Sequence, residues 1–154
     1  MIIFTIIFLI IDICTKLIIN KYLVVNESIL VIKHFLNITH VRNTGAAWSL
    51  FSNQTILLLI VSTIVIIGII LYIKKNKPTN IIEKIAYSMI LGGAIGNFTD
   101  RILYGYVIDF IDITLFGYNY PIFNLADTFI VIGVIILIII SWRCEHVRTK
   151  SNRK

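Results

Sequence analysis

The chain has 154 residues, of which 58% are hydrophobic and 14% are charged, and its mean hydropathy is +0.91. Ordinary soluble domains carry roughly 25% charged residues, so this composition excludes that class and predicts a single integral membrane domain over residues 1–154. The net charge of +6 does not indicate nucleic-acid binding. The basic residues lie beside apolar segments, where the positive-inside rule and anionic headgroups account for them.

The first apolar segment, residues 2–19, is long enough to cross a bilayer and contains two charges, Asp12 and Lys16. Their spacing of four places both side chains on one face of a helix, where they can pair. An ion pair inside a span faces protein rather than lipid. We therefore predict that Asp12 and Lys16 form a structural link between helices.

Residues 20–53 mix β-branched and polar side chains without a helical stripe, which predicts two or three short strands outside the bilayer. His34 and His40 lie six residues apart in this segment, and no third metal ligand accompanies them, so we expect surface histidines. The segment ends near Asn43-Thr44-Gly45, a turn signal followed by small residues.

Three further apolar segments follow, at residues 55–73, 81–98 and about 122–142, which gives four expected spans. Gly92 and Gly96 in the third form a small-xxx-small pattern that permits close helix packing. The loop after the second span and the C-terminal tail are both basic, which predicts that they are cytoplasmic. Both termini then lie inside, and the strand segment and the 100–121 loop lie on the outer face.

The polar residues of the second half concentrate between positions 92 and 127, where four of the eight acidic residues lie. Asn97, Asp100 and Arg101 share one helical face, and so do Asn124 and Asp127. If both faces point into the bundle, they form a polar pocket beneath the outer surface, which Asp109 on the connecting loop can reach.

Two neighbouring carboxylates share one proton, so one can accept a proton from water while the other donates to a carbonyl oxygen. That chemistry is peptide hydrolysis without a metal, cofactor or covalent intermediate. Zn²⁺ prefers His or Cys ligands, and Ca²⁺ needs more closely spaced oxygens, so no metal is expected. The residues alone do not decide which two acids pair. Asp100 can pair with Arg101, Asp109 and Asp112 point to opposite sides of a strand, and Asp127 lies deepest.

Two other classes of protein are compatible with intramembrane acids. A small proton-coupled transporter would relay protons through Asp12, but Lys16 would neutralise that residue, and a transporter has no need of the large polar outer segment. A non-catalytic assembly subunit would use the glycine face for packing. Both explain fewer of the polar residues than a peptidase does.

Five motifs together carry a resemblance to a known family. They are DICTK at 12–16, RNTGAA at 42–47, GGAIGNFTDR at 92–101, VIDF at 107–110 and FNLAD at 123–127. In this order the chain resembles the bacterial lipoprotein signal peptidases, also called signal peptidase II, which are aspartic membrane proteases.

The resemblance implies four transmembrane helices with a small extracytoplasmic β-cradle. We expect the chain to act as a monomer in the bacterial cell membrane. It implies removal of signal peptides from diacylglyceryl-modified prolipoproteins, at the amino side of the lipidated cysteine, and inhibition by globomycin. By motif, the catalytic pair falls on Asp109 and Asp127, and Asp112 is left to solvent. The remaining matches are Asn43, Asn97, Arg101 and Asn124 as substrate-binding residues, and Asp12, Lys16 and Asp100 as structural polar residues.

Overall fold

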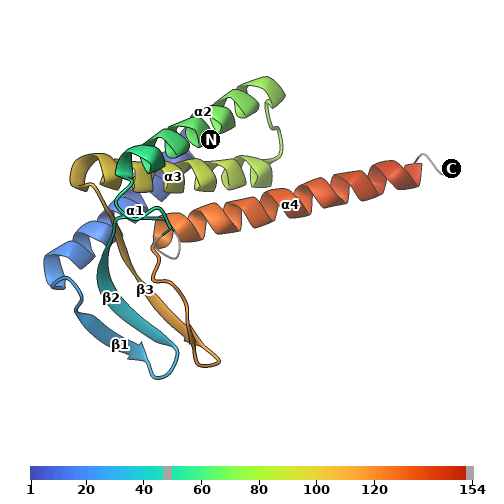
Figure 1. Cartoon of the computed structure of the whole chain (residues 1–154). Coiled ribbons are helices and arrows are strands. Elements are labelled where there is room, and N and C mark those ends of the chain that lie inside the picture. Colours follow the sequence, from blue (N-terminus) through green and yellow to red (C-terminus); the bar gives the residue numbers. More distant parts are fainter. Residues whose placement is uncertain (47–49, 152–154) are drawn as a thin grey trace.

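The protein is described by a computed structural model over residues 1–46 and 50–151, with side chains described to Arg143. It contains four helices, α1 (Ile2–Tyr22), α2 (Thr55–Asn76), α3 (Ile81–Tyr104) and α4 (Leu125–Ser151). Four strands, β1 (Ser28–Ile32), β2 (Leu36–Asn43), β3 (Val107–Leu115) and β4 (Tyr118–Asn119), lie at one end of the bundle (Figure 1). Ala47 of the RNTGAA motif falls outside the described residues.

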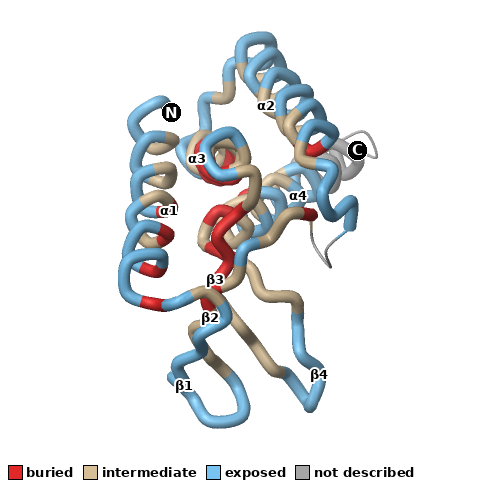
Figure 2. The backbone as a smooth tube through the Cα atoms, turned by 60° about the vertical axis from the view of Figure 1, so that its left-hand side comes forward, coloured by how far each residue is buried: buried red, intermediate tan, exposed pale blue. Residues whose placement is uncertain are grey.

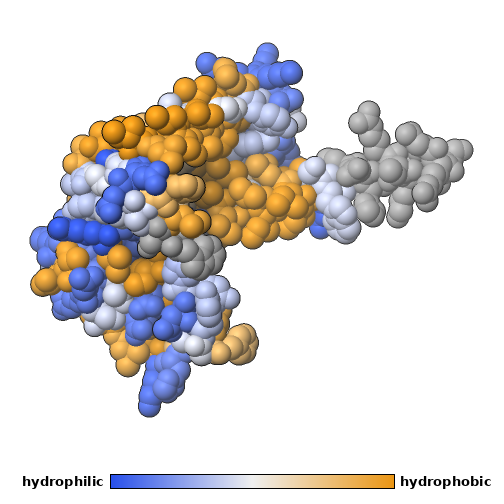
Figure 3. Space-filling view, viewed as in Figure 1, coloured by the Kyte–Doolittle hydropathy of each residue, from blue (hydrophilic) through white to orange (hydrophobic). Residues whose placement is uncertain are grey.

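Helix α3 is the centre of the bundle, because it contacts α1, α2 and α4. Its residues Ala86 to Gly93 are all buried, and Figure 2 shows this buried stretch between α1 and α2. The other three helices expose most of their apolar side chains. Figure 3 shows the resulting hydrophobic surface over the helices and a more hydrophilic surface over the sheet.

Within the described part of the chain, three helical segments are long and apolar enough to cross a membrane: Ile2–Tyr22, Thr55–Asn76 and Leu125–Arg143. In lipid, an apolar segment must pair its backbone groups internally, and a helix does this within one segment. The protein is thus a mainly helical membrane protein with three apolar helices and a small antiparallel sheet. Helix α3 is more polar than these three.

The glycine pattern in α3 produces close packing against α1, as expected. A Cβ atom on Gly92 would lie 2.8 Å from the Cβ of Phe8, and one on Gly96 would collide with the Asp12 carboxylate. Each position therefore accepts only glycine at this helix separation. The same close approach brings the polar face of α1 next to the polar end of α3.

The sheet has the order β1-β2-β3-β4, and all its neighbouring strands are antiparallel. The last strand, β4, has only two residues. The segment after it pairs with β3, because Phe123 and Ile111 exchange backbone hydrogen bonds of 2.7 and 3.1 Å. For this reason α4 begins at Leu125, three residues later than expected.

The interpretation of both histidines as surface residues is wrong for His40, which is only 1% exposed. It lies on β2 beside an irregularity in the β2–β3 register between Ile38 and Val41. Its Nδ1 lies 2.9 Å from the carbonyl oxygen of Leu23, and this oxygen can only accept, so Nδ1 carries the proton. His34 is exposed in the turn between β1 and β2.

Candidate active site

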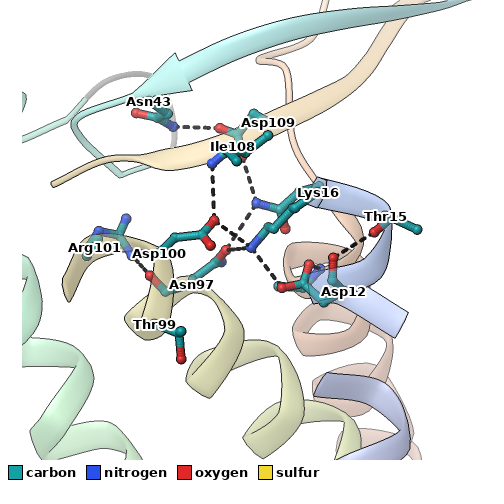
Figure 4. A network of polar contacts seen from close by, with 12 residues as sticks. Asp12, Thr15, Lys16, Asn43, Asn97, Thr99, Asp100, Arg101, Ile108 and Asp109 are labelled. Carbon is teal, nitrogen blue, oxygen red and sulfur yellow. Dashed lines mark hydrogen bonds and ion pairs between the residues drawn. The ribbon is translucent and has the colours of Figure 1, made fainter. Parts of the chain in front are cut away.

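A buried ammonium group lies at the base of the polar cluster. Lys16 Nζ is 2.8 Å from Asp12 Oδ2 and 3.1 Å from Asp100 Oδ2, and all three residues are at most 5% exposed (Figure 4). The expected pair between Asp12 and Lys16 is therefore present. Asp100, however, pairs with Lys16 rather than with its neighbour Arg101.

Both carboxylates around Lys16 also accept backbone hydrogen bonds from other elements. Asp12 Oδ1 accepts from Ala126 N at the start of α4 (3.0 Å), and Asp100 Oδ2 accepts from Ile108 N on β3 (3.2 Å). An anion at a helix N-terminus is favoured by the unpaired N–H groups there. The three charged side chains thus connect α1, α3, α4 and β3 beneath the site.

Asn97 connects Lys16 to Asp127 through hydrogen bonds. Its Oδ1 accepts from Lys16 Nζ (2.9 Å) and from Asn124 Nδ2 (3.1 Å), while its Nδ2 donates to Asp127 Oδ1 (2.8 Å). Because an ammonium group can only donate, the amide oxygen must face Lys16 and the amide nitrogen must face Asp127. The orientation of Asn97 is therefore determined by its neighbours.

Asn124 and Asp127 form a reciprocal cap at the start of α4. Asn124 Oδ1 accepts from Asp127 N (3.0 Å), and Asp127 Oδ2 accepts from Asn124 N (3.3 Å). This is the geometry of a capping box, which satisfies N–H groups that a helix end otherwise leaves unpaired. The cap holds the Asp127 carboxylate in one place at the N-terminus of α4.

Asp109 projects from β3 into the same cluster and is 2% exposed. Its Oδ1 accepts from Asn124 Nδ2 (2.7 Å) and its Oδ2 accepts from Asn43 Nδ2 (2.8 Å). Asn124 therefore bridges Asp109 and Asp127. Asn43 is the last residue of β2, and its own oxygen accepts from Gly45 N (2.9 Å), which closes the predicted turn.

The surroundings of Asp109 favour its protonated form. Burial, followed by the nearby negative charge of Asp127, raises the pKa of Asp109 from 3.8 to about 7, against the opposing hydrogen bonds from Asn43 and Asn124. Near neutral pH, this carboxyl group therefore exchanges a proton while it faces a second carboxylate. That is the condition for acid–base chemistry by a carboxyl pair.

Arg101 lies beside the cluster and supports the turn at its edge. Its Nη2 donates to the carbonyl oxygen of Gly45 (2.8 Å). The guanidinium group is half-buried and faces the carboxyl side of the site. It brings a positive charge near both acids without pairing directly with either.

Asp112 was expected to face solvent, and this expectation is wrong. It is half-buried, and its Oδ2 accepts a 2.8 Å hydrogen bond from Thr39 Oγ1, which in turn contacts Ser28 Oγ at 2.8 Å. It lies three residues beyond Asp109 on β3, so its side chain leaves the opposite side of the strand. Asp112 thus takes part in a hydrogen-bonded row across the sheet, away from the carboxyl pair.

Two features of the site were missed from the sequence. The capping box had a local signal, since Asn-x-x-Asp directly precedes an apolar run at 124–127. The Thr39–Asp112 contact had none.

Within residues 1–46 and 50–143, no three His, Cys, Asp or Glu side chains converge as metal ligands. The Lys16 ammonium occupies the place between Asp12 and Asp100 where a cation would be held.

A buried carboxyl group, Asp109, and a half-buried one, Asp127, are bridged by Asn124 at the junction of a membrane helix bundle and a small sheet. This arrangement fits the class of membrane aspartic peptidases. The comparisons with known proteins agree. The family model described as signal peptidase (SPase) II matches residues 4–143, and the chain belongs to this family. Its function is that of a lipoprotein signal peptidase, and a transporter is not favoured.

Relatives and solved structures cover most of the chain. Lipoprotein signal peptidases of Staphylococcus aureus, among them those of strains JH9 and N315, are 45% identical over 128 residues, which is 83% of this chain and 78% of theirs. A bacterial membrane enzyme solved by the in meso method at 2.3 Å is 40% identical, with a TM-score of 0.85 over 99% of this chain and 90% of that one. A second, at 1.9 Å, is 43% identical, with a TM-score of 0.81 over 90% and 89%.

Proposed function

We propose that Asp109 and Asp127 are the catalytic pair that removes signal peptides from diacylglyceryl-modified prolipoproteins, at the bond before the lipidated cysteine. The observation that carries this proposal is the Asn124 bridge. One residue contacts both acids, and one of these acids has a pKa of about 7. A carboxyl group that exchanges its proton near neutral pH beside a second carboxylate is suited to acid–base catalysis.

In the reactive state, Asp109 carries the proton and Asp127 is ionised. Asp127 takes a proton from water as the water oxygen adds to the scissile carbonyl carbon, and Asp109 gives its proton to the carbonyl oxygen. In the second step Asp127 returns its proton to the amide nitrogen and the C–N bond breaks. Asp109 then takes back a hydroxyl proton, which restores the starting state.

The four amide and guanidinium side chains have positioning roles in this scheme. Asn97 links Asp127 to the Lys16 ammonium and so orients the Asp127 carboxylate, and Asn43 with Asn124 holds both oxygens of Asp109. Each can also donate to the substrate backbone when it enters. We place Arg101 at the edge where it stabilises the developing oxyanion.

The proposal includes a fourth span, α3. Its 24 residues give a length of about 36 Å, more than the roughly 30 Å hydrocarbon core. Its polar side chains face other helices, which makes such a span tolerable. With four spans, both termini lie on the same side. The basic 74–84 loop and the basic C-terminal tail identify that side as the cytoplasm, so the site lies near the outer face. The sheet forms a cradle there for prolipoprotein or a globomycin-type inhibitor, in one domain that acts as a monomer without a cofactor.

Cleavage of a lipidated prolipoprotein by purified protein tests the pair. Asp109→Asn and Asp127→Asn are expected to lose at least about 10³-fold in kcat, because neither variant can complete the proton cycle. Asp112→Asn is the matched control on the same strand and retains activity. Near-normal cleavage by either first variant, or equal loss in the control, rules out the assignment. A chelator is expected to leave the rate unchanged.

A further inference from the structure

A cavity lies at the outer end of α1, separate from the carboxyl pair. Its volume is about 330 Å³, and it is lined by residues 20–25 together with His40 and Arg42. It occupies the junction where α1 leaves the membrane and β2 returns toward the site. Figure 3 shows hydrophilic residues gathered in this region, between the apolar helices and the sheet. None of the proposed catalytic or substrate-binding residues lines it.

The cavity carries two cations that lack neutralising partners. Lys21 and Arg42 are both exposed, and in the described part of the chain neither has a carboxylate within ion-pair distance. The acidic residue nearest to the cavity along the chain is Glu27, and its Oε2 accepts a hydrogen bond from Val24 N (2.7 Å). The cations lie over aromatic rings instead, Lys21 5.2 Å from the centre of Tyr22 and Arg42 4.9 Å from that of Tyr106. The cavity therefore has an excess of positive charge.

The floor of the cavity is fixed before any ligand binds. His40 N donates to Glu27 O (3.0 Å), Asn26 N donates to His40 O (2.7 Å), and His40 Nδ1 donates to Leu23 O. Three hydrogen bonds thus hold β2 to the segment that follows α1. A preorganised cavity loses less conformational entropy when it binds a ligand.

The surface of α1 below the cavity suits the acyl chains of a lipid. Leu17 and Ile18 lie four and three residues before Lys21, on the same helical face, and are 51% and 55% exposed. A lipid standing along this face would place its chains against Leu17 and Ile18 and its headgroup at Lys21. Tyr22 and Lys21 are also the residue types that mark a membrane interface.

We propose that this cavity binds the phosphodiester headgroup of an anionic phospholipid of the outer leaflet, with Lys21 and Arg42 as its cationic ligands. The bound lipid fastens the end of α1 to β2 and so stabilises the junction. The chemistry recognised is a phosphate anion, and the acyl surface beside it assigns that phosphate to a lipid rather than to free phosphate. The site does not involve the catalytic pair, but its place in the outer leaflet rests on the topology proposed above.

The test measures thermal unfolding of the full chain in nanodiscs of phosphatidylcholine with and without phosphatidylglycerol, and lipid retention by native mass spectrometry. Phosphatidylglycerol is expected to raise the midpoint and remain bound. Lys21→Gln is expected to weaken retention about fivefold, the effect of one interfacial cation, and Lys21→Arg restores it. Lys33→Gln, in the β1–β2 turn outside the cavity, is the matched control.

Three results would overturn the proposal. The first is an equal midpoint in both lipids. The second is an equal loss of retention in Lys33→Gln and Lys21→Gln, which would show a general surface-charge effect. The third is full stabilisation by millimolar inorganic phosphate in phosphatidylcholine alone, which would make the ligand a free anion. Because Lys21 is exposed and outside the catalytic cluster, retained prolipoprotein cleavage confirms that each variant is folded.

Discussion

The raised pKa of Asp109 predicts that the protein loses stability as the pH rises through 7. A carboxyl group whose pKa is higher in the folded state than in the unfolded state binds a proton on folding between the two values. Here those values are about 7 and 3.8. The stabilising effect of that proton is complete below pH 3.8 and is lost as the pH rises through about 7.

The size of the effect follows from the shift. About three pKa units correspond to about 4 kcal/mol in total. Between pH 5 and 8, which is part of this window, the free energy of unfolding falls by about 3 kcal/mol. For a chain of this length, that loss lowers the midpoint of thermal unfolding by about 10 °C. Asp109→Asn cannot ionise, so it lacks this component. The variant forfeits one accepted hydrogen bond, which lowers its stability by a similar amount at every pH.

The assay compares midpoints of wild type and Asp109→Asn in the same detergent at half-unit steps from pH 5 to 8. All other titrating groups are common to both, so the difference between the two curves isolates Asp109. We expect the wild-type midpoint to fall relative to the variant as pH increases, most steeply between pH 5 and 6, with the fall slowing near pH 7 and ending above it. Parallel curves would refute the reasoning. The cleavage rate of the wild type falls in the same range, because Asp109 loses the proton it donates.

Three further substitutions, with Gly68→Ala as a control, test the packing and the hydrogen bonds around the site. Gly96→Ala is expected to lower the free energy of unfolding by about 1–3 kcal/mol in denaturant, because its methyl group would collide with the Asp12 carboxylate. Gly68→Ala on α2 is the control. A Cβ atom there meets no other atom, so this variant is expected to be neutral or slightly stabilising. Lys16→Met leaves two buried acids unpaired and is expected to cost about 3–5 kcal/mol; an unchanged midpoint would contradict the buried ion pairs. Asn124→Ala removes both the helix cap and the bridge between Asp109 and Asp127. We expect it to lower the free energy of unfolding by about 1–2 kcal/mol and to lower kcat. A loss of stability with unchanged kcat would show that the bridge does not act in catalysis.

The polar cluster could be predicted because a charge is conspicuous in an apolar chain and helical spacing assigns it a face. Asp12 and Lys16 were paired by their separation of four, and Asn97 was placed with the site by the same arithmetic. The partner of Asp100 could not be predicted, since Lys16 lies 84 residues earlier and no local pattern relates them. Their meeting depends on how closely α1 packs on α3, which Gly92 and Gly96 determine.

The strands were predictable only in outline. Alternation assigns side chains to the faces of a regular strand, but β2 has an irregular register between Ile38 and Val41. His40 lies within that interval, so its burial could not be inferred from a period of two. The partner of Asp112 depends on the same interval, because Thr39 reaches it from beside the bulge. Long-range pairing, rather than local preference, determined both outcomes.

The polarity of α3 follows from its position in the bundle. A helix surrounded by other helices meets protein on most sides, so it can carry Ser88, Asn97 and Asp100 in its interior-facing positions, which lipid would not tolerate. The apolar helices show the opposite pattern, since only 6–17% of their membrane-length windows are buried inside the protein. The three described helical segments that are apolar enough to span a membrane are thus also little covered by the rest of the protein. A central helix can present carboxylates and amides to its neighbours without exposing them to hydrocarbon, which explains why the site is built against α3.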